Sequence, residues 1–187
     1  MEEEIKKTLE VLKKGGIMLY PTDTIWGIGC DATNAKAVDK VFKIKHRPDN
    51  KSMILLVDDV SKIEKYVKYV PPIAYELIAN YTEPLTIVYS GAINLPKNVV
   101  SSDGTIAIRL VRDEFCQKLI SEFGKPIIST SANISGAETP FMFNLISKEI
   151  IDNVDYVVKL NQNQINKLKA STIIKVMENG EFEVLRK

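Results

Sequence analysis

Short apolar runs alternate with stretches of helical periodicity along nearly the whole chain, and this alternation restricts the fold more than any other feature. The apolar runs predict strands at residues 17–20, 53–57, 85–89, 106–110, 126–130 and 156–160. Apolar residues at helical spacing predict helices at residues 2–14, 34–45, 61–67, 72–81, 113–123 and 139–151. Strands that alternate with helices form a sheet with helices packed against it. The pattern therefore predicts an α/β fold.

The C-terminal segment adds a different kind of strand pairing. Asn179 and Gly180 separate the apolar runs 171–177 and 182–185, and Asn-Gly between two such runs is a strong indication of a β-hairpin. Antiparallel pairing in this hairpin, together with parallel strands elsewhere, makes the sheet mixed. At 187 residues the chain has the usual length of one domain. We therefore expect a single domain over residues 1–187, with a twisted, open, mixed sheet and flanking helices.

Charge and histidine content exclude several classes of protein. The chain carries 25 Lys and Arg against 24 Asp and Glu, a formal net charge of +1, whereas proteins that bind nucleic acid through their overall field carry a larger excess. The single histidine, His46, excludes a multi-histidine metal site. A Ser-His-Asp triad would have to use this one residue. We expect no metal bound by protein side chains alone.

Cysteine usage and the length of the apolar runs bear on location. Cys30 and Cys116 lie 86 positions apart and form no CxxC pair, so we expect two reduced thiols. No apolar run approaches the roughly 20 residues of a membrane span. The start, Met-Glu-Glu-Glu, lacks the basic residues and apolar stretch of a signal peptide. These features predict a cytoplasmic protein that does not use a membrane.

Polar chemistry concentrates in three segments, the first of which is residues 20–29, Tyr-Pro-Thr-Asp-Thr-Ile-Trp-Gly-Ile-Gly. It directly follows a predicted strand, and open α/β sheets bind ligands at loops that leave strand ends. Two threonine hydroxyls and a carboxylate offer polar contacts, while Gly27 and Gly29 allow a ligand to approach the backbone. The alternative is a turn whose polar side chains bond to their own backbone. We interpret the segment as a binding loop.

The second segment, residues 45–51, leaves the C-terminal end of a predicted helix. Lys45, Arg47 and Lys51 place three cations beside His46 in a short connection, which suits a polyphosphate. The alternative is a solvated basic last turn that interacts with the helix dipole. For His46 we expect a partly exposed side chain with no role in proton transfer.

The third segment, residues 128–136, runs from a predicted strand into four hydroxyls and an amide. Such side chains are unfavourable inside a core and suit a polar ligand at a strand end. A simple Asx or Ser/Thr turn is the alternative. No Gly-x-x-x-x-Gly-Lys-Ser/Thr sequence occurs, and no Gly-x-Gly-x-x-Gly follows the first strand. A P-loop is therefore excluded, and a Rossmann nucleotide site is disfavoured.

Taken in order, five blocks resemble the short, single-domain form of the YrdC-type threonylcarbamoyl-AMP synthase family. The family's Pro-Thr-Asp/Glu-Thr-x-Tyr/Trp-Gly-Leu/Ile-Gly block is similar to residues 21–29. Its Lys-x-Arg and Ser-x-Asn elements are similar to residues 45–47 and 131–133, and its Val/Ile-Ala-Val/Ile-Arg and Ser-Thr-Val/Ile-Val/Ile elements to residues 106–109 and 171–174. The resemblance extends over residues 10–187.

The resemblance implies a YrdC-like fold whose sheet surrounds a concave, positively charged face. It also implies an enzyme that joins L-threonine, bicarbonate and ATP into threonylcarbamoyl-AMP and releases pyrophosphate, with magnesium on the triphosphate. Transfer proteins would then pass the threonylcarbamoyl group to tRNA. By motif position, the residues for L-threonine are Thr24, Arg109, Ser129 and Ser171. Those for ATP are Arg47, Lys51, Thr105, Ser131, Thr139 and Arg186. The catalytic positions are Lys45, Arg47, Ser131 and Asn133.

Two departures and two alternatives accompany this expectation. Leu56 occupies a position where some members carry a histidine, and Ala170 one where an acid is frequent. One alternative is a module that binds RNA on the same basic face without catalysis; for the enzyme itself we expect only weak, salt-sensitive RNA binding. The other is a carbamoyl-transfer domain of the hydrogenase-maturation type, which belongs to long multidomain proteins with zinc-finger-like cysteines.

Overall fold

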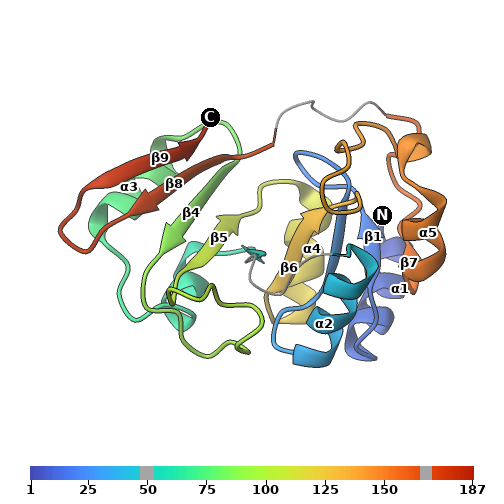
Figure 1. Ribbon diagram of the computed structural model, residues 1–187, viewed down its shortest axis with the longest axis horizontal. Helices are drawn as coiled ribbons and strands as arrows, with labels where there is room; N and C mark the ends of the chain where they lie inside the picture. Colours follow the sequence, from blue (N-terminus) through green and yellow to red (C-terminus); the bar gives the residue numbers. More distant parts are fainter. Residues whose placement is uncertain (47–52, 165–169) are drawn as a thin grey trace.

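A single mixed sheet forms the centre of the structure, a computed structural model that describes residues 1–46, 53–164 and 170–187. Within these ranges the sheet has nine strands in the order β7-β1-β2-β6-β3-β5-β4-β8-β9 (Figure 1). Their bounds are β1 Met18–Tyr20, β2 Gly27–Asp31, β3 Ile54–Val57, β4 Leu85–Tyr89, β5 Ile106–Leu110, β6 Ile127–Ser131, β7 Tyr156–Val157, β8 Thr172–Val176 and β9 Phe182–Arg186. Parallel pairs (β1 with β7, β3 with β5, β4 with β8) occur beside antiparallel ones. The mixed α/β sheet is confirmed, as is the C-terminal hairpin.

Helices begin and end where local sequence provides caps. The helices are α1 Glu2–Lys13, α2 Ala35–Ile44, α3 Pro72–Asn80, α4 Glu114–Phe123 and α5 Lys148–Asn153, with short 3-10 segments η1 Val60–Lys65 and η2 Phe143–Leu145. The Asn34 side chain caps α2 by accepting hydrogen bonds from two backbone N–H groups, and the Asp113 side chain caps α4 by accepting one from the Cys116 N–H. Gly124 ends α4 with φ at 73°, a conformation that favours glycine.

Four predicted elements are wrong in type or extent. Residues 27–31 form the buried strand β2, although the first polar segment was expected to be a loop through residue 29. The helix predicted over 139–151 is limited to α5, because Ser147 supplies its cap and accepts a hydrogen bond from the Ile150 N–H. The strand predicted over 156–160 stops at Val157, and residues 60–65 form a 3-10 rather than an α-helix.

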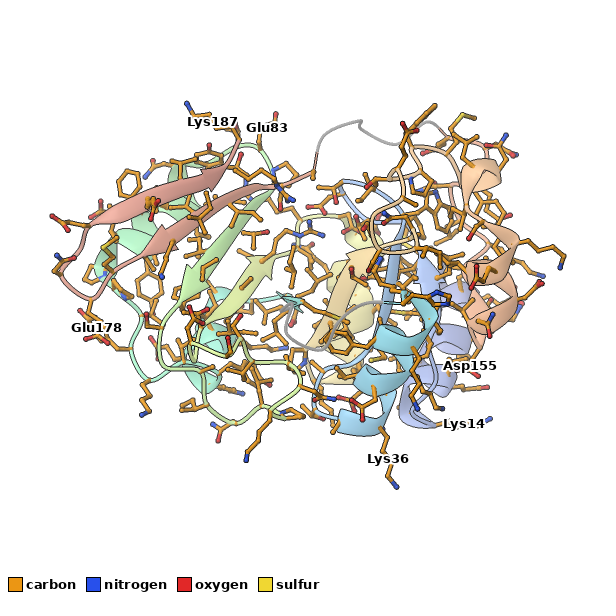
Figure 2. The ribbon with its side chains drawn as sticks, in the orientation of Figure 1. Lys14, Lys36, Glu83, Asp155, Glu178 and Lys187 are labelled. Carbon is orange, nitrogen blue, oxygen red and sulfur yellow. The ribbon has the colours of Figure 1, made fainter. Side chains whose placement is uncertain are left out.

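Two hydrophobic cores lie on opposite faces of the sheet, because successive side chains of a strand point to opposite sides. Leu19, Ile28 and Leu55 join the core beneath α2 and α3. Their neighbours Met18, Tyr20 and Leu56 join the core beneath α1 and α4. The other members of this second core are Ile5, Leu9, Leu12, Val111, Phe115, Cys116, Leu119, Ile120, Ile127 and Val158. Exposed charged side chains such as Lys36 and Lys187 extend from the edges of the molecule (Figure 2). In the part of the chain described here, no helix is long and apolar enough to cross a membrane.

Candidate functional site

A cavity of about 530 Å³ opens on the sheet face that carries α1 and α4. Strand register places Arg109, Ile54 and Ser129 on this face. Ile54 on β3 pairs with Ser129 on β6, and Leu56, two residues after Ile54 and therefore on the same face, pairs with Arg109 on β5. Seven of the residues expected to bind substrates line the cavity: Thr24, Arg109, Ser129, Ser131, Thr139, Ser171 and Arg186. The cavity thus brings together segments that are separated by more than 160 positions in the sequence.

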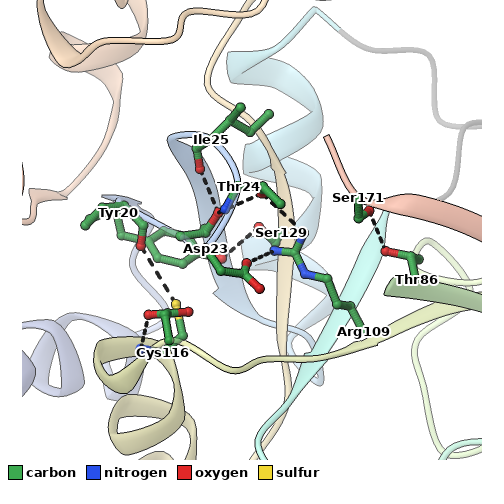
Figure 3. Close-up of polar contacts among 12 residues, drawn as sticks. Tyr20, Asp23, Thr24, Ile25, Thr86, Arg109, Cys116, Ser129 and Ser171 are labelled. Carbon is green, nitrogen blue, oxygen red and sulfur yellow. Dashed lines mark hydrogen bonds and ion pairs between the residues drawn. The ribbon is translucent and has the colours of Figure 1, made fainter. Parts of the chain in front are cut away.

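Arg109 is a charged residue of the cavity lining, and only 4% of its surface is exposed. One terminal nitrogen donates a hydrogen bond to the Thr24 hydroxyl at 3.3 Å, and the other forms an ion pair with Asp23 Oδ1 at 3.3 Å (Figure 3). Its buried Nε has no hydrogen-bond partner within the described ranges. A buried guanidinium held in this way keeps donors available for an anion, and a carboxylate matches its planar geometry.

Hydroxyl groups surround the guanidinium on neighbouring strands. The Ser129 Oγ accepts a hydrogen bond from the Tyr20 hydroxyl at 2.7 Å. The Ser171 and Thr86 hydroxyls lie 2.8 Å apart and form a second buried pair (Figure 3). These side chains can orient a small polar ligand through several directional contacts.

Arg186 contributes a second cation to the cavity. Its Nε and one terminal nitrogen donate to the Ser171 carbonyl at 3.1 and 2.9 Å. Burial lowers the pKa of Arg186, and the positive charge of Arg109 lowers it further. No carboxylate is found among the described residues that line the cavity. Two arginines in one partly enclosed space therefore favour an anionic ligand.

Lys45 is buried, which contradicts the alternative interpretation of residues 45–51 as a solvated basic turn. Only 1% of its surface is exposed, and its ammonium donates to the backbone carbonyls of Ser131, at 2.5 Å, and of Asn133, at 2.6 Å. Its own carbonyl accepts from the Ser135 N–H at 2.9 Å. Lys45 therefore joins the end of α2 to the chain leaving β6, next to the cavity rather than among its lining residues. Arg47 and Lys51 lie outside the described residues.

Three other residues singled out from the sequence do not belong to the cavity lining: Asn133, Thr105 and His46. The Asn133 amide donates to the Ala137 carbonyl at 2.6 Å, whereas its Oδ1 is buried with no hydrogen-bond partner in the described chain. Thr105 donates to Asp103 at 2.7 Å and does not belong to the cavity lining. The imidazole of His46 is exposed, as expected, and lies 3.0 Å from a Glu149 carboxylate oxygen.

Sequence reasoning counted the Asp23 carboxylate among the polar groups of the first segment but gave no role to Tyr20 or Thr86. Each of the three contacts a residue of the cavity. Tyr20 and Asp23 belong to the segment that was singled out, so a signal for them was present. It also gave a wrong role to Gly29, which was expected to let a ligand approach. A Cβ there would lie 2.9 Å from the Tyr20 ring and 2.7 Å from the Ile128 carbonyl, so this glycine makes room for the protein itself.

Comparison with known proteins identifies the family. Residues 10–187 match the Sua5/YciO/YrdC family, which carries the description "Telomere recombination". The chain belongs to this family. A putative threonylcarbamoyl-AMP synthase of Methanocaldococcus jannaschii is 40% identical over 183 residues, which are 95% of this chain and 84% of that protein. The threonylcarbamoyl-AMP synthase of Pseudoalteromonas translucida is 32% identical over 84% of this chain and 86% of its own length.

Solved structures of Sua5/YciO/YrdC proteins have the same fold. E. coli YciO matches all of this chain and 90% of its own with a TM-score of 0.86 and 25% identity, so this chain resembles the short, single-domain members. P. abyssi Sua5 complexed with L-threonine also matches the whole chain, with a TM-score of 0.88 and 25% identity. This chain spans about half of that longer protein, 54%.

At one position where some family members carry histidine, this chain has Leu56. Leu56 is fully buried, pairs with Arg109 in the sheet register and packs in the core beneath α1 and α4. It is not among the residues that line the cavity. The side chain at this position is thus apolar, and it belongs to the core rather than to the cavity.

Asp113 gives the site region a testable pH dependence. It caps α4 through the Cys116 N–H, and burial raises the pKa of its carboxyl, with a smaller contribution from Asp23. The folded state therefore binds this proton more tightly than the unfolded state. Stabilisation from the proton is complete below about pH 4 and is lost as the pH rises through the folded pKa. We expect Asp113→Asn, which keeps a capping oxygen, to be more stable than the wild type at pH 7.

The measurement is urea unfolding from pH 4 to 7. Asp59 offers a matched control, because it caps η1 through Ser61 and hydrogen bonds from Ser61 lower the pKa of its carboxyl. Asp59→Asn is expected to change the pH dependence in the opposite direction and at lower pH, because the stability contributed by the wild-type carboxylate is lost as the pH falls below about 4. For this control, unfolding is therefore also measured from about pH 2.5 to 4. An Asp113→Asn protein that loses stability on going from pH 4 to pH 7 relative to the wild type would contradict the expectation.

Proposed function

We propose that this protein is an L-threonylcarbamoyl-AMP synthase, which makes threonylcarbamoyl-AMP from L-threonine, bicarbonate and ATP. One observation carries the proposal: the buried Arg109 guanidinium, whose Nε has no hydrogen-bond partner among the described residues, lines a cavity of about 530 Å³ together with several hydroxyl groups. Such a cavity is of the size that holds small ligands. Relatives that carry the name threonylcarbamoyl-AMP synthase, and the P. abyssi Sua5 structure with L-threonine, support the assignment.

In this proposal the amino acid binds at the Arg109 end of the cavity. The guanidinium pairs with the threonine carboxylate, and the remaining contacts come from the hydroxyls of Thr24, Ser129 and Ser171. ATP binds alongside, through Ser131, Thr139 and Arg186 of the cavity lining. The family motifs add Thr105, which is not in that lining, and Arg47 and Lys51, which lie outside the described residues. Lys45 holds the backbone on which Ser131 and Asn133 are carried, so that its contribution to catalysis includes positioning.

The reaction then needs two reactants held in line and no protein nucleophile. The threonine amine adds to carbon dioxide derived from bicarbonate and gives a carbamate, whose oxygen attacks the α-phosphorus of ATP and displaces pyrophosphate. Orientation and neutralisation of charge on phosphorus are the contributions asked of the protein. Burial raises the pKa of both thiols, Cys30 and Cys116, so neither is a ready thiolate nucleophile.

Magnesium would accompany the triphosphate rather than occupy a site of its own. Within the described ranges, no carboxylate lines the cavity and no group of three or more His, Cys, Asp or Glu residues is placed to hold a metal. The side chains present therefore do not form a magnesium cage, and an ion would be held by phosphate oxygens and water. No step above depends on it.

A direct test incubates the purified protein with ATP, bicarbonate and threonine. We expect threonine-dependent pyrophosphate release and the acyl-adenylate by mass spectrometry. Reactions without bicarbonate or threonine are the controls. Pyrophosphate release that does not depend on threonine, or none at all, would contradict the proposal. Tight RNA binding that persists at high salt would support the RNA-binding alternative, because binding through phosphates alone weakens steeply with salt.

Threonine is expected to react better than serine. The Arg109 end of the cavity has apolar lining from Ile54, Ala107 and Ile173 as well as hydroxyls. An apolar contact for one methyl group discriminates by roughly 1–3 kcal/mol, which is about 10- to 150-fold in kcat/KM. The ratio of kcat/KM for threonine to kcat/KM for serine is measured with each amino acid at subsaturating concentration. Equal values of kcat/KM would contradict the prediction. Transfer of the product to tRNA by partner proteins remains part of the proposal.

A further inference from the structure

The ring of Tyr20 crosses one strand to reach the cavity. Tyr20 on β1 pairs with Gly27 on β2, and Gly29, two residues further on, pairs with Ser129 on β6. All four residues therefore share one face of the sheet. A Cβ at Gly27 would lie 3.4 Å from the ring and a Cβ at Gly29 only 2.9 Å from it. The two glycines leave a slot over β2, and the ring lies in it.

The slot brings the tyrosine hydroxyl to a cavity residue. Tyr20 is fully buried, and its hydroxyl donates to the Ser129 Oγ at 2.7 Å (Figure 3). Burial raises the pKa of Tyr20 well above its usual value, so the phenol keeps its proton and remains a donor. Since Tyr20 uses one lone pair of the serine oxygen, the serine's own hydrogen must point elsewhere. Ser129 lines the cavity, which is where an acceptor for that hydrogen can be bound.

We propose that Tyr20 is a positioning residue that fixes Ser129 as a hydrogen-bond donor toward the cavity. Ser129 then selects a ligand that presents an acceptor oxygen beside Arg109. The proposal rests on the proposed function in naming that ligand, L-threonine. It differs from the expectation for Ser129 alone, because it states which way the hydroxyl points and which buried residue sets the direction.

Tyr89 provides a matched control. It is also a buried tyrosine on a central strand, with 1% of its surface exposed, but it lies in the core on the other face of the sheet. Its hydroxyl has no hydrogen-bond partner among the described residues. Tyr20→Phe and Tyr89→Phe thus remove the same atom from similarly buried rings. Only the first removal takes a hydrogen bond from a cavity residue.

The experiment measures L-threonine binding by calorimetry and KM for threonine and ATP, in Tyr20→Phe, Ser129→Ala, the double variant and Tyr89→Phe. Melting temperatures confirm that each variant is folded. We expect Tyr20→Phe to weaken threonine binding by about five- to tenfold and to leave KM for ATP unchanged, because one oriented hydrogen bond contributes on this scale. The double variant is expected to bind no more weakly than Ser129→Ala, because Tyr20 acts through that hydroxyl. Tyr89→Phe is expected to bind as the wild type does.

Three results would overturn the positioning role of Tyr20. Threonine affinity in Tyr20→Phe equal to that of Tyr89→Phe would overturn the positioning role and leave the proposed function standing. Additive losses in the double variant would also overturn it, since Tyr20 would then act independently of Ser129. Wild-type protein that binds no threonine would overturn both the positioning role and the proposed function.

Discussion

Lys45→Met is expected to lower the free energy of unfolding by about 2–4 kcal/mol, because the carbonyls of Ser131 and Asn133 lose a charged donor in a buried place. Methionine keeps most of the aliphatic stem, so the change is confined largely to the ammonium. The same variant is expected to lose about 100-fold in turnover, since both carbonyls belong to the chain that carries Ser131 and Asn133 into the site. Urea unfolding and threonine-dependent pyrophosphate release provide the two measurements.

The control for this prediction lies on the same helix. Lys43 is in the last turn of α2 and is exposed, so Lys43→Met is expected to change stability by no more than about 0.5 kcal/mol through the helix dipole. Turnover in both variants is compared well below the lower melting temperature, which separates loss of folding from loss of rate. A Lys45→Met protein as stable as Lys43→Met would refute the anchoring role.

Arg109→Lys is expected to raise KM for L-threonine by about 100-fold and to change KM for ATP little. Lysine keeps the positive charge but lacks the planar guanidinium. A lysine ammonium therefore cannot bond to Thr24 and to both oxygens of a ligand carboxylate at the same time. Losing charge-assisted hydrogen bonds costs about 1.5–3 kcal/mol, which corresponds to the expected change. Steady-state kinetics with threonine varied at saturating ATP give the value.

Arg112→Lys is the matched control for this substitution. Arg112 follows β5, is exposed, and donates to the Ile78 carbonyl at 2.7 Å, away from the residues that line the cavity. We expect its kinetics to equal those of the wild type. If Arg109→Lys also kept its KM for threonine, a carboxylate would not be bound at Arg109, and the placement of the amino acid proposed here would be wrong.

Local signals explain which parts of the fold were predicted from sequence. The caps at Asn34 and Asp113 and the stop at Gly124 depend on side chains and dihedral angles within a few residues, so they are visible in the sequence. The Asn179-Gly180 hairpin is of the same kind. Strand β2 was missed because its two glycines indicate a turn locally, whereas the Tyr20 ring, supplied by another strand, fills the space above them.

The candidate site also has one part that the sequence indicated and one part that only the fold decides. Hydroxyl-rich segments at strand ends were enough to single out the stretches that contain Thr24 and Ser129. Arg109 and Ser171 were nominated only by the resemblance to the family motifs. Their shared cavity depends on the strand order, which places β2, β6, β3, β5, β4 and β8 side by side. Spacing along the chain does not specify that order.

Periodicity and interactions between near neighbours were enough to predict the α/β class, the hairpin and the helix ends, and residue types in the three polar segments indicated a polar binding site. Only the tertiary structure decided that Lys45 is buried against the chain leaving β6, and that Tyr20 reaches across β2 to Ser129. Both contacts join residues at least 86 positions apart. The partners of a buried polar group are set by whatever the fold packs against it, and that packing is decided by the whole sheet rather than by any one segment.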